Sequence, residues 1–240
     1  PPRSTLFPYT TLFRSTREHR MADLVLSDYN LLPIINRFGI RLGFRDKTVE
    51  QICKERNVNS EFFLAIINTY INPDYLPDSG LINVPVNSIV DYLQQTHRYY
   101  IEYTVPEIER LLSLLLKSSN TQNLHLIEKF YLDYKVELIE HIQNEESQVF
   151  PYVLNLVNDK FRKVNYSIHS FEREHTDLDE KLSDLRNLII KYLEPTYNDN
   201  FCNDFLLALQ RFEDDLKDHA RIEDKILVPV VAKIEEELNG

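Results

Sequence analysis

The chain has 240 residues, a formal net charge of −11 and 43% hydrophobic residues, enough apolar material for one large domain or for a domain with a small module. Its two cysteines exclude a disulfide scaffold and a cysteine-rich zinc site, and they make a reducing, cytoplasmic setting the expectation. The excess of acids argues against broad nucleic-acid binding, and no apolar stretch is long enough to cross a bilayer. With only four glycines, the composition favours long helices over a β-sandwich or barrel.

Residues 1–20 differ in pattern from the rest of the chain. They contain the near-repeat Arg3-Ser-Thr-Leu-Phe7 and Thr11-Leu-Phe-Arg-Ser15, without helical periodicity. They also lack the long apolar segment of a signal peptide. We interpret this stretch as a non-native segment derived from a cloning adapter, with the native chain and a helix start at Met21.

Residues 21–72 have the pattern of a small helical domain. Three short helices are expected, near Tyr29–Phe38, Thr48–Glu55 and Ser60–Tyr70. Helix caps are expected at Asp46, Thr48 and Ser60, with a break at Gly39 and Gly43. Residues 73–84, which contain two prolines and a glycine, are expected to form a linker.

Residues 85–240 show helical periodicity over long segments separated by short breaks. The segments lie near 86–117, 121–157, 161–193 and 200–237. Long helices joined by short loops predict an all-α fold with an up-down-up-down four-helix bundle. Three prolines inside these segments are expected to end or bend the helices, namely Pro106, Pro151 and Pro229.

The histidines of the bundle follow an internal repeat of 78 residues. The set His97, His141, Glu145 and Pro151 recurs as His175, His219, Glu223 and Pro229. In each half a histidine precedes a glutamate by four residues, which puts both side chains on one face of a helix. Because matching sets on a pseudo-twofold bundle can point to one centre, the repeat predicts a metal site.

The predicted donors are four imidazoles and two carboxylates, with no thiolate. This set suits two first-row metals, each with two histidines, bridged by the carboxylates and by an oxo or hydroxo group. Iron is the natural candidate for such a site in a bundle core. A ferritin-like Glu-x-x-His motif fits only once, at Glu172 and His175, and therefore fails. His125 and His169 have no counterpart in the repeat and are assigned surface or packing roles.

This pattern resembles the hemerythrin-like domain of the Repair of Iron Centres family, the YtfE/ScdA type, and the segment Arg37–Glu50 looks like the small N-terminal domain of that family. The resemblance implies that the six His and Glu positions hold a non-haem di-iron centre, with the glutamates bridging the irons. It also implies that acids matching Glu137 and Glu174 line the approach to the centre.

The same resemblance implies a role in restoring iron–sulfur clusters damaged by nitrosative or oxidative stress. The small ligand would be NO, O₂ or peroxide, and damaged iron–sulfur proteins would be partners. Iron donation, sensing and a redox activity such as NO reduction all remain open. One departure concerns the adjacent cysteine pair that the family's N-terminal domain usually carries. Here that region reads Gly39-Ile-Arg-Leu-Gly-Phe44, and Cys53 is later and alone.

Two alternatives are weighed against this hypothesis. An oxygen-binding or sensing hemerythrin adds a fifth histidine four residues from the third-helix ligand, where this chain has Phe171 and Asp179. Hemerythrins also use an aspartate five residues after the last histidine; the repeat favours Glu223, but Asp224 stays open. A regulator would use its N-terminal module, with the helix-turn-helix-like Thr48–Tyr70 segment, to bind DNA or a protein partner. Residues 28–70 carry six basic and five acidic side chains, a poor balance for binding phosphates.

Overall fold

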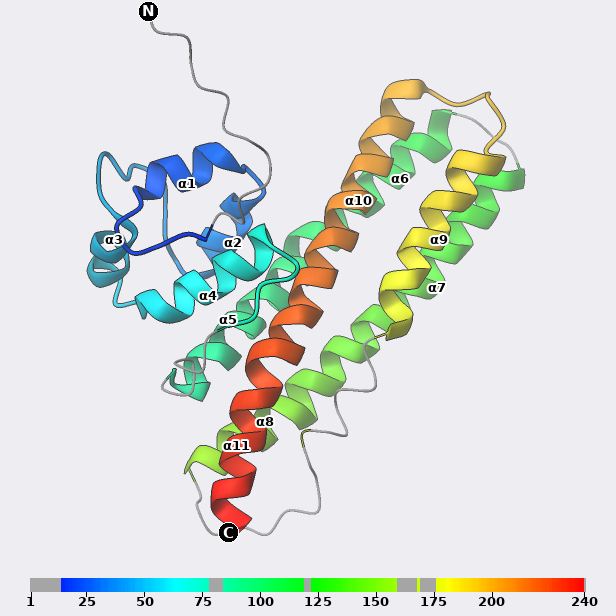
Figure 1. Ribbon diagram of the computed structural model, residues 1–240. Helices are drawn as coiled ribbons and strands as arrows, with labels where there is room; N and C mark the ends of the chain where they lie inside the picture. Colours follow the sequence, from blue (N-terminus) through cyan, green and yellow to red (C-terminus); the bar gives the residue numbers. More distant parts are fainter. Residues whose placement is uncertain (1–13, 78–83, 119–121, 159–167, 169–175, 240) are drawn as a thin grey trace, which may run out of the picture. The chain divides into compact units, whose positions relative to one another are not determined.

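The computed structural model describes residues 14–77, 84–118, 122–158, 168 and 176–239 (Figure 1). These residues form helices and no β-strand, which confirms the all-α prediction. The chain divides into two compact units, Pro1–Leu81 and Ile82–Gly240. Within the described ranges, no helix is long and apolar enough to cross a membrane.

The first unit contains four short helices. They are α1 (Met21–Ser27), α2 (Leu31–Arg37), α3 (Val49–Glu55) and α4 (Ser60–Ile71). Helix α1 covers the helix start expected at Met21, and the other three correspond to the three predicted segments. The break between α2 and α3 contains Gly39 and Gly43 at φ values of 69° and 103°, which side chains with a Cβ rarely adopt.

Side-chain caps set the starts of α3 and α4. Thr48 accepts the Gln51 backbone N–H at 3.3 Å, and the Gln51 side chain accepts the Thr48 N–H at 3.0 Å, a capping box that confirms the predicted cap. Helix α4 is capped by Asn59 and not by Ser60, because the Asn59 side chain accepts the Phe62 N–H at 2.9 Å.

Residues 14–20 make specific contacts within this unit. The Ser15 backbone N–H donates to the Asn68 side chain at 2.7 Å, and the Asn68 amide donates back to the Ser15 carbonyl at 3.2 Å. Asp46, which was expected to cap a helix, instead forms an ion pair with Arg20 at 3.1 Å. This part of the segment interpreted as non-native is therefore attached to the unit, while residues 1–13 lie outside the described residues.

The second unit is built from long helices, three of which pass through a π turn. The first helix comprises α5 (Val86–Tyr99), η2 (Tyr100–Thr104) and α6 (Val105–Ser118), and the second comprises α7 (Gln122–Asn144), η3 (Glu145–Val149) and α8 (Phe150–Asn158). The third is α9 (Thr176–Tyr192), and the fourth comprises α10 (Asp199–Ile222), η5 (Glu223–Leu227) and α11 (Val228–Asn239). The predicted start of the third helix, near 161, lies outside the described residues.

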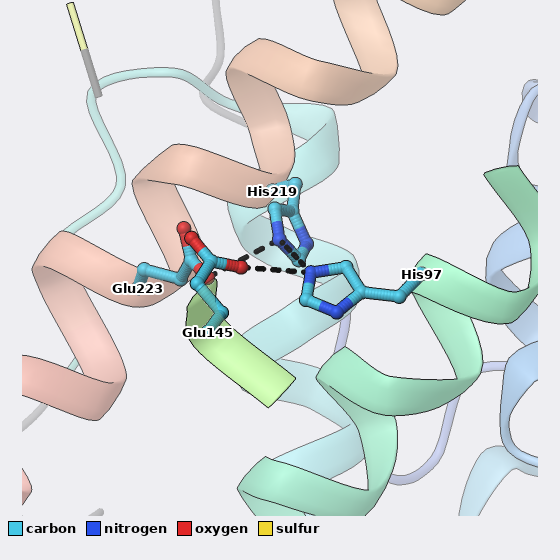
Figure 2. A group of neighbouring side chains, drawn as sticks. All are labelled: His97, Glu145, His219 and Glu223. Carbon is cyan, nitrogen blue, oxygen red and sulfur yellow. Dashed lines mark hydrogen bonds and ion pairs between the residues drawn. The ribbon is translucent and has the colours of Figure 1, made fainter. Parts of the chain in front are cut away.

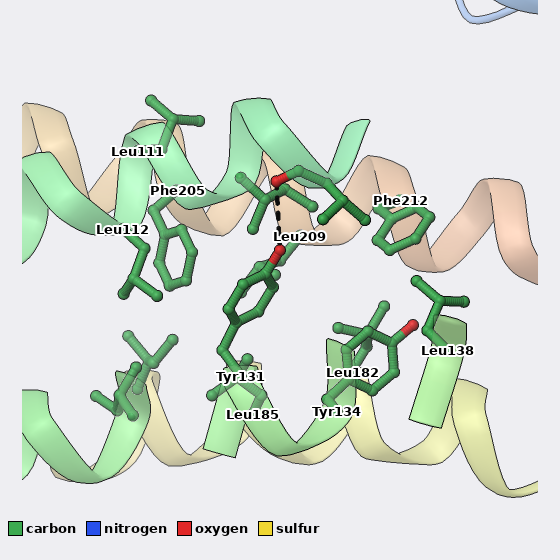
Figure 3. Packing of buried hydrophobic residues seen from close by; sticks show 14 of the residues in the cluster. Leu111, Leu112, Tyr131, Tyr134, Leu138, Leu182, Leu185, Phe205, Leu209 and Phe212 are labelled. Carbon is green, nitrogen blue, oxygen red and sulfur yellow. Dashed lines mark hydrogen bonds between the residues drawn. The ribbon is translucent and has the colours of Figure 1, made fainter. Parts of the chain in front are cut away.

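An apolar core joins α6, α7, α9 and α10. Helix α10 packs against α6 and α9, and α7 packs against α9. Tyr131 and Phe205 are among its largest buried side chains, and the Tyr131 hydroxyl donates to the Val105 carbonyl at 3.4 Å (Figure 3). The core extends to Leu138 and Leu216, each three residues before a predicted ligand histidine. The core therefore fixes the two helices that carry those histidines.

Candidate metal centre

Prolines explain the three π turns found in the described residues. Each turn ends two residues before a proline, and the residue just before that proline donates its backbone N–H to the carbonyl five residues earlier. These hydrogen bonds run from Val105 to Tyr100, from Phe150 to Glu145 and from Val228 to Glu223. A proline has no N–H and its ring clashes with the carbonyl four residues earlier, so a wider turn relieves both problems. The helices continue through these prolines and do not end there.

Two of the π turns carry the predicted carboxylates. Glu145 is the first residue of η3 and Glu223 is the first residue of η5, and both side chains are 0% exposed. The histidine four residues earlier lies beside each of them. The distance from His141 Nε2 to Glu145 Oε1 is 2.8 Å, and that from His219 Nε2 to Glu223 Oε1 is 3.2 Å.

Four side chains from three of the long helices converge into one buried cluster (Figure 2). His97 comes from α5, Glu145 from η3, His219 from α10 and Glu223 from η5, and their potential ligand atoms all lie within 4.8 Å of one another. The Nε2 atoms of His97 and His219 are 3.1 Å apart. His97 Nε2 is also 2.9 Å from Glu145 Oε2.

These separations fit the ligands of a single metal ion. Two ligand atoms about 2.1 Å from one ion, at right angles, lie about 3.0 Å apart. Three of the separations within the cluster are 2.9, 3.1 and 3.2 Å. Imidazoles together with carboxylates, without a thiolate, suit first-row metals such as iron. The cluster can therefore hold a metal ion.

The charge of the cluster also favours a cation. Burial by itself lowers the pKa of His97. The hydrogen bonds to Glu145 and Glu146, together with the negative charges of Glu145 and Glu223, have a larger and opposite effect, and they raise this pKa to about 9. Two fully buried carboxylates need a positive partner, because an uncompensated buried charge is costly. A bound metal ion would supply that charge.

His141 lies at the edge of this cluster. It contacts the other oxygen of Glu145, so the two oxygens of one carboxylate face two different histidines. Four of the six predicted ligands thus form the cluster and His141 adjoins it. The sixth, His175, lies outside the described residues, as does Glu174. Glu137 is exposed and forms an ion pair with Lys181 on α9.

The structure also distinguishes between Glu223 and Asp224, the two candidates for the last ligand. Glu223 is fully buried inside the cluster, whereas Asp224 is exposed. The cluster therefore contains the residue that the repeat favoured. Of the two histidines without a repeat counterpart, His125 is exposed and lies 3.5 Å from Glu128, which fits a surface role. His169 lies outside the described residues.

One residue at the centre was missed by the sequence analysis. Glu146 Oε1 lies 2.9 Å from Nδ1 of His97, the ring nitrogen that faces away from the cluster. The Gln94 side chain donates to the other oxygen of Glu146 at 2.8 Å. One sequence feature could have pointed to Glu146: it is an acid directly after Glu145, and the other half of the repeat also has an acid, Asp224, at the equivalent position.

A small cavity of about 20 Å³ adjoins the cluster, enough for one water-sized molecule. Its walls are mostly apolar, apart from three histidines and one tyrosine. The lining residues are His97, Tyr100, Leu138, His141, Ile142, Leu178, Leu216, His219 and Ala220. These lining residues form pairs that are 78 positions apart in the sequence, such as Ile142 and Ala220. His97 is the exception, since its counterpart His175 lies outside the described residues. The internal repeat thus shapes this space as well as the ligand set.

The fold and the site define a helical-bundle protein with a buried metal-binding cluster. The comparison with protein families agrees: residues 88–231 match the model of the hemerythrin HHE cation-binding domain. The chain therefore belongs to the hemerythrin HHE family, whose domains bind metal ions, usually iron. The comparison with curated proteins found no match.

Proposed function

We propose that this protein holds a carboxylate-bridged pair of irons and reacts with NO or O₂-derived species during nitrosative or oxidative stress. The observation that carries the proposal is the position of Glu145. Its Oε2 is 2.9 Å from His97 Nε2, and its Oε1 is 2.8 Å from His141 Nε2. A carboxylate that faces one histidine with each oxygen has the arrangement of a bridge between two metal ions.

The histidines divide into two groups around this bridge. His97 and His219 lie on one side, 3.1 Å apart, and would hold the first ion together with Glu145 and Glu223. His141 lies on the other side, and the repeat supplies His175 as its partner. When bound, the two irons supply redox chemistry and open positions for a small ligand.

The chain itself would position the metal ions, enclose them and select the small ligand that reaches them. The buried histidines and glutamates hold the ions in a fixed geometry. The neighbouring cavity has room for about one small molecule, and its leucine and isoleucine walls favour a weakly polar ligand over bulk water. NO and O₂ have that size and polarity.

The proposed physiological role is the repair of damaged iron–sulfur proteins in the cytoplasm, with those proteins as partners. It is supported by the resemblance of both the ligand pattern and the Arg37–Glu50 segment to the Repair of Iron Centres family. Cys53 is 1% exposed, and burial raises the pKa of its thiol to about 12, so it remains an unreactive thiol at neutral pH. The proposal therefore rests on the irons, because Cys53 gives the first unit no reactive thiol.

The test is metal analysis of the purified chain, with optical spectra of its reduced and oxidised forms with and without NO. We expect two irons per chain and a new absorption when NO is added to the reduced protein. His141→Ala should reduce the iron content, whereas His125→Ala should keep both irons because His125 is an exposed histidine. A folded protein with only trace iron would contradict the proposal. Stable, reversible O₂ binding would indicate an oxygen-binding hemerythrin instead.

A further inference from the structure

We propose that Glu146 is a positioning residue that fixes the proton on Nδ1 of His97 and thereby directs Nε2 of that ring toward the metal. The inference deepens the metal site described above. It rests on metal binding by the cluster, and it does not depend on the number of irons or on the physiological role.

The argument begins with the two nitrogens of one buried ring. His97 is 3% exposed, and consecutive glutamates contact its opposite nitrogens. Glu145 Oε2 is 2.9 Å from Nε2, and Glu146 Oε1 is 2.9 Å from Nδ1. An ionised carboxylate only accepts hydrogen bonds, so the protonated ring donates to both glutamates. When the ring gives up its Nε2 proton to bind a metal ion, it keeps the Nδ1–H, which donates to Glu146. The lone pair is then on Nε2, which faces the cluster.

The Glu146 carboxylate is itself held in place. Gln94, three residues before His97 on the same helix, donates its side-chain N–H to Glu146 Oε2 at 2.8 Å. Glu146 therefore spans two residues on one face of α5. Phe150 stacks on the His97 ring with centroids 5.5 Å apart and an interplanar angle of 17°. One helix thus supplies both the acceptor at the edge of the ring and the aromatic group on its face.

Glu146 acts through the ring and not as a ligand, because its contact is on the side of His97 opposite to the cluster. A carboxylate that accepts the outer N–H of a ligating histidine fixes the orientation of the ring and makes its other nitrogen more basic. The second cluster histidine lacks this support: His219 Nδ1 is buried and accepts or donates no hydrogen bond within the described part of the chain. The two histidines of the cluster are therefore supported differently.

The experiment uses the full chain loaded with Co²⁺, whose visible absorption reports the ligand field. Glu146→Ala should weaken Co²⁺ binding about 10- to 100-fold and change the spectrum at saturating metal. Glu146→Gln should lie between this variant and wild type, since the amide oxygen still accepts the hydrogen bond without the charge. The matched control is Glu140→Gln, which removes an exposed carboxylate from the same helix. It should bind within about twofold of wild type.

Wild-type affinity and an unchanged saturated spectrum in Glu146→Ala would overturn the proposal. A Glu146→Gln variant that binds Co²⁺ no more tightly than Glu146→Ala would also overturn it. Glutamine still provides a hydrogen-bond acceptor for His97, so equal affinities would show that the acceptor does not matter. If Glu146→Ala fails to fold, Glu146→Gln and a Gln94→Leu variant give the same readout, with a smaller loss expected for Gln94→Leu. If wild type binds no Co²⁺ or Fe²⁺, the metal site itself fails, and that result is distinct from a loss confined to Glu146.

Discussion

The two halves of the bundle are Val86–Asn158 and Thr176–Asn239. Both build their part of the metal-binding cluster from the same local features. In each half a histidine is followed four residues later by a fully buried glutamate that begins a π turn. In each, a proline lies two residues beyond that turn. The cavity beside the cluster is lined by matched pairs from both halves. The ligand geometry is therefore encoded twice.

The halves differ in what surrounds the ligands. Glu146 is half-buried against His97, whereas Asp224, at the equivalent position, is exposed. The first helix of the first half has a π turn before Pro106, whereas α9 is an uninterrupted α-helix with Asp184 at the matching place. The repeat thus specifies the histidine, the glutamate and the proline of each half, whereas the burial of the acid after the glutamate and the course of the first helix differ between the halves.

The largest expected effect tests the equivalence of the two carboxylates. Glu145→Ala and Glu223→Ala should each reduce metal affinity by at least about 100-fold, because each removes a buried ligand and not merely its support. Isothermal titration with Fe²⁺ or Co²⁺ measures the effect. Glu137→Gln, which alters an exposed ion pair with Lys181, is the control and should bind normally. Near-normal binding by either alanine variant would show that only one half supplies a bridging carboxylate.

The next test concerns the prolines that produce the π turns. Pro151→Ala and Pro229→Ala each restore a backbone N–H, so the helix can return to α-type hydrogen bonding and the free energy of unfolding of the metal-free protein should rise by about 2 kcal/mol. Metal affinity should fall about tenfold in both, because the glutamate at the start of the turn changes its direction.

Denaturant unfolding and metal titration together check this trade-off between stability and binding. The loop variant Pro195→Ala should leave metal affinity unchanged, because Pro195 is exposed before α10. If the two bundle variants keep wild-type affinity, the π turns are not needed to place the ligands.

A smaller effect is expected from making one repeat pair of cavity residues identical. Ala220 and Ile142 are repeat partners that line the cavity, and Ala220→Ile copies the larger side chain into the second half. Since the cavity is only about 20 Å³, the added carbons should slow NO binding to the reduced, metal-loaded protein about tenfold without loss of metal. Stopped-flow absorption measures the rate. The exposed substitution Leu207→Ile on the same helix should leave it unchanged, and an equal slowing in both variants would argue against this cavity as the ligand's site.

The smallest effect should come from Asp224→Asn. Because Asp224 is exposed, its substitution should change metal affinity by about twofold or less. The same metal titration used for Glu146→Gln allows a direct comparison at equivalent positions. A loss in Asp224→Asn as large as that in Glu146→Gln would show that the two halves support their ligands alike.

Local rules explain why much of the bundle was predictable. Helical periodicity, the spacing of four between histidine and glutamate, and the missing N–H of proline all act within one or two turns of helix, so they are visible in the sequence. The repeat of 78 residues then indicated which of the local pairs belong together. Short-range detail still failed in places: Asn59 and not Ser60 caps α4, since both residues are suitable and backbone geometry chooses between them.

Longer-range features were decided by the tertiary structure. Glu146 and His97 are 49 residues apart, and their contact exists only because α5 packs against α8, the helix that continues η3. Glu137 matched an acid near the centre by resemblance, yet it is directed to Lys181 across the interface between α7 and α9. The sequence by itself determined the helices, their prolines and the residues capable of binding a metal. The packing of whole helices decided which acid forms a hydrogen bond with which histidine. The partners of a side chain on a neighbouring helix are set by the rotation and the register of the two helices.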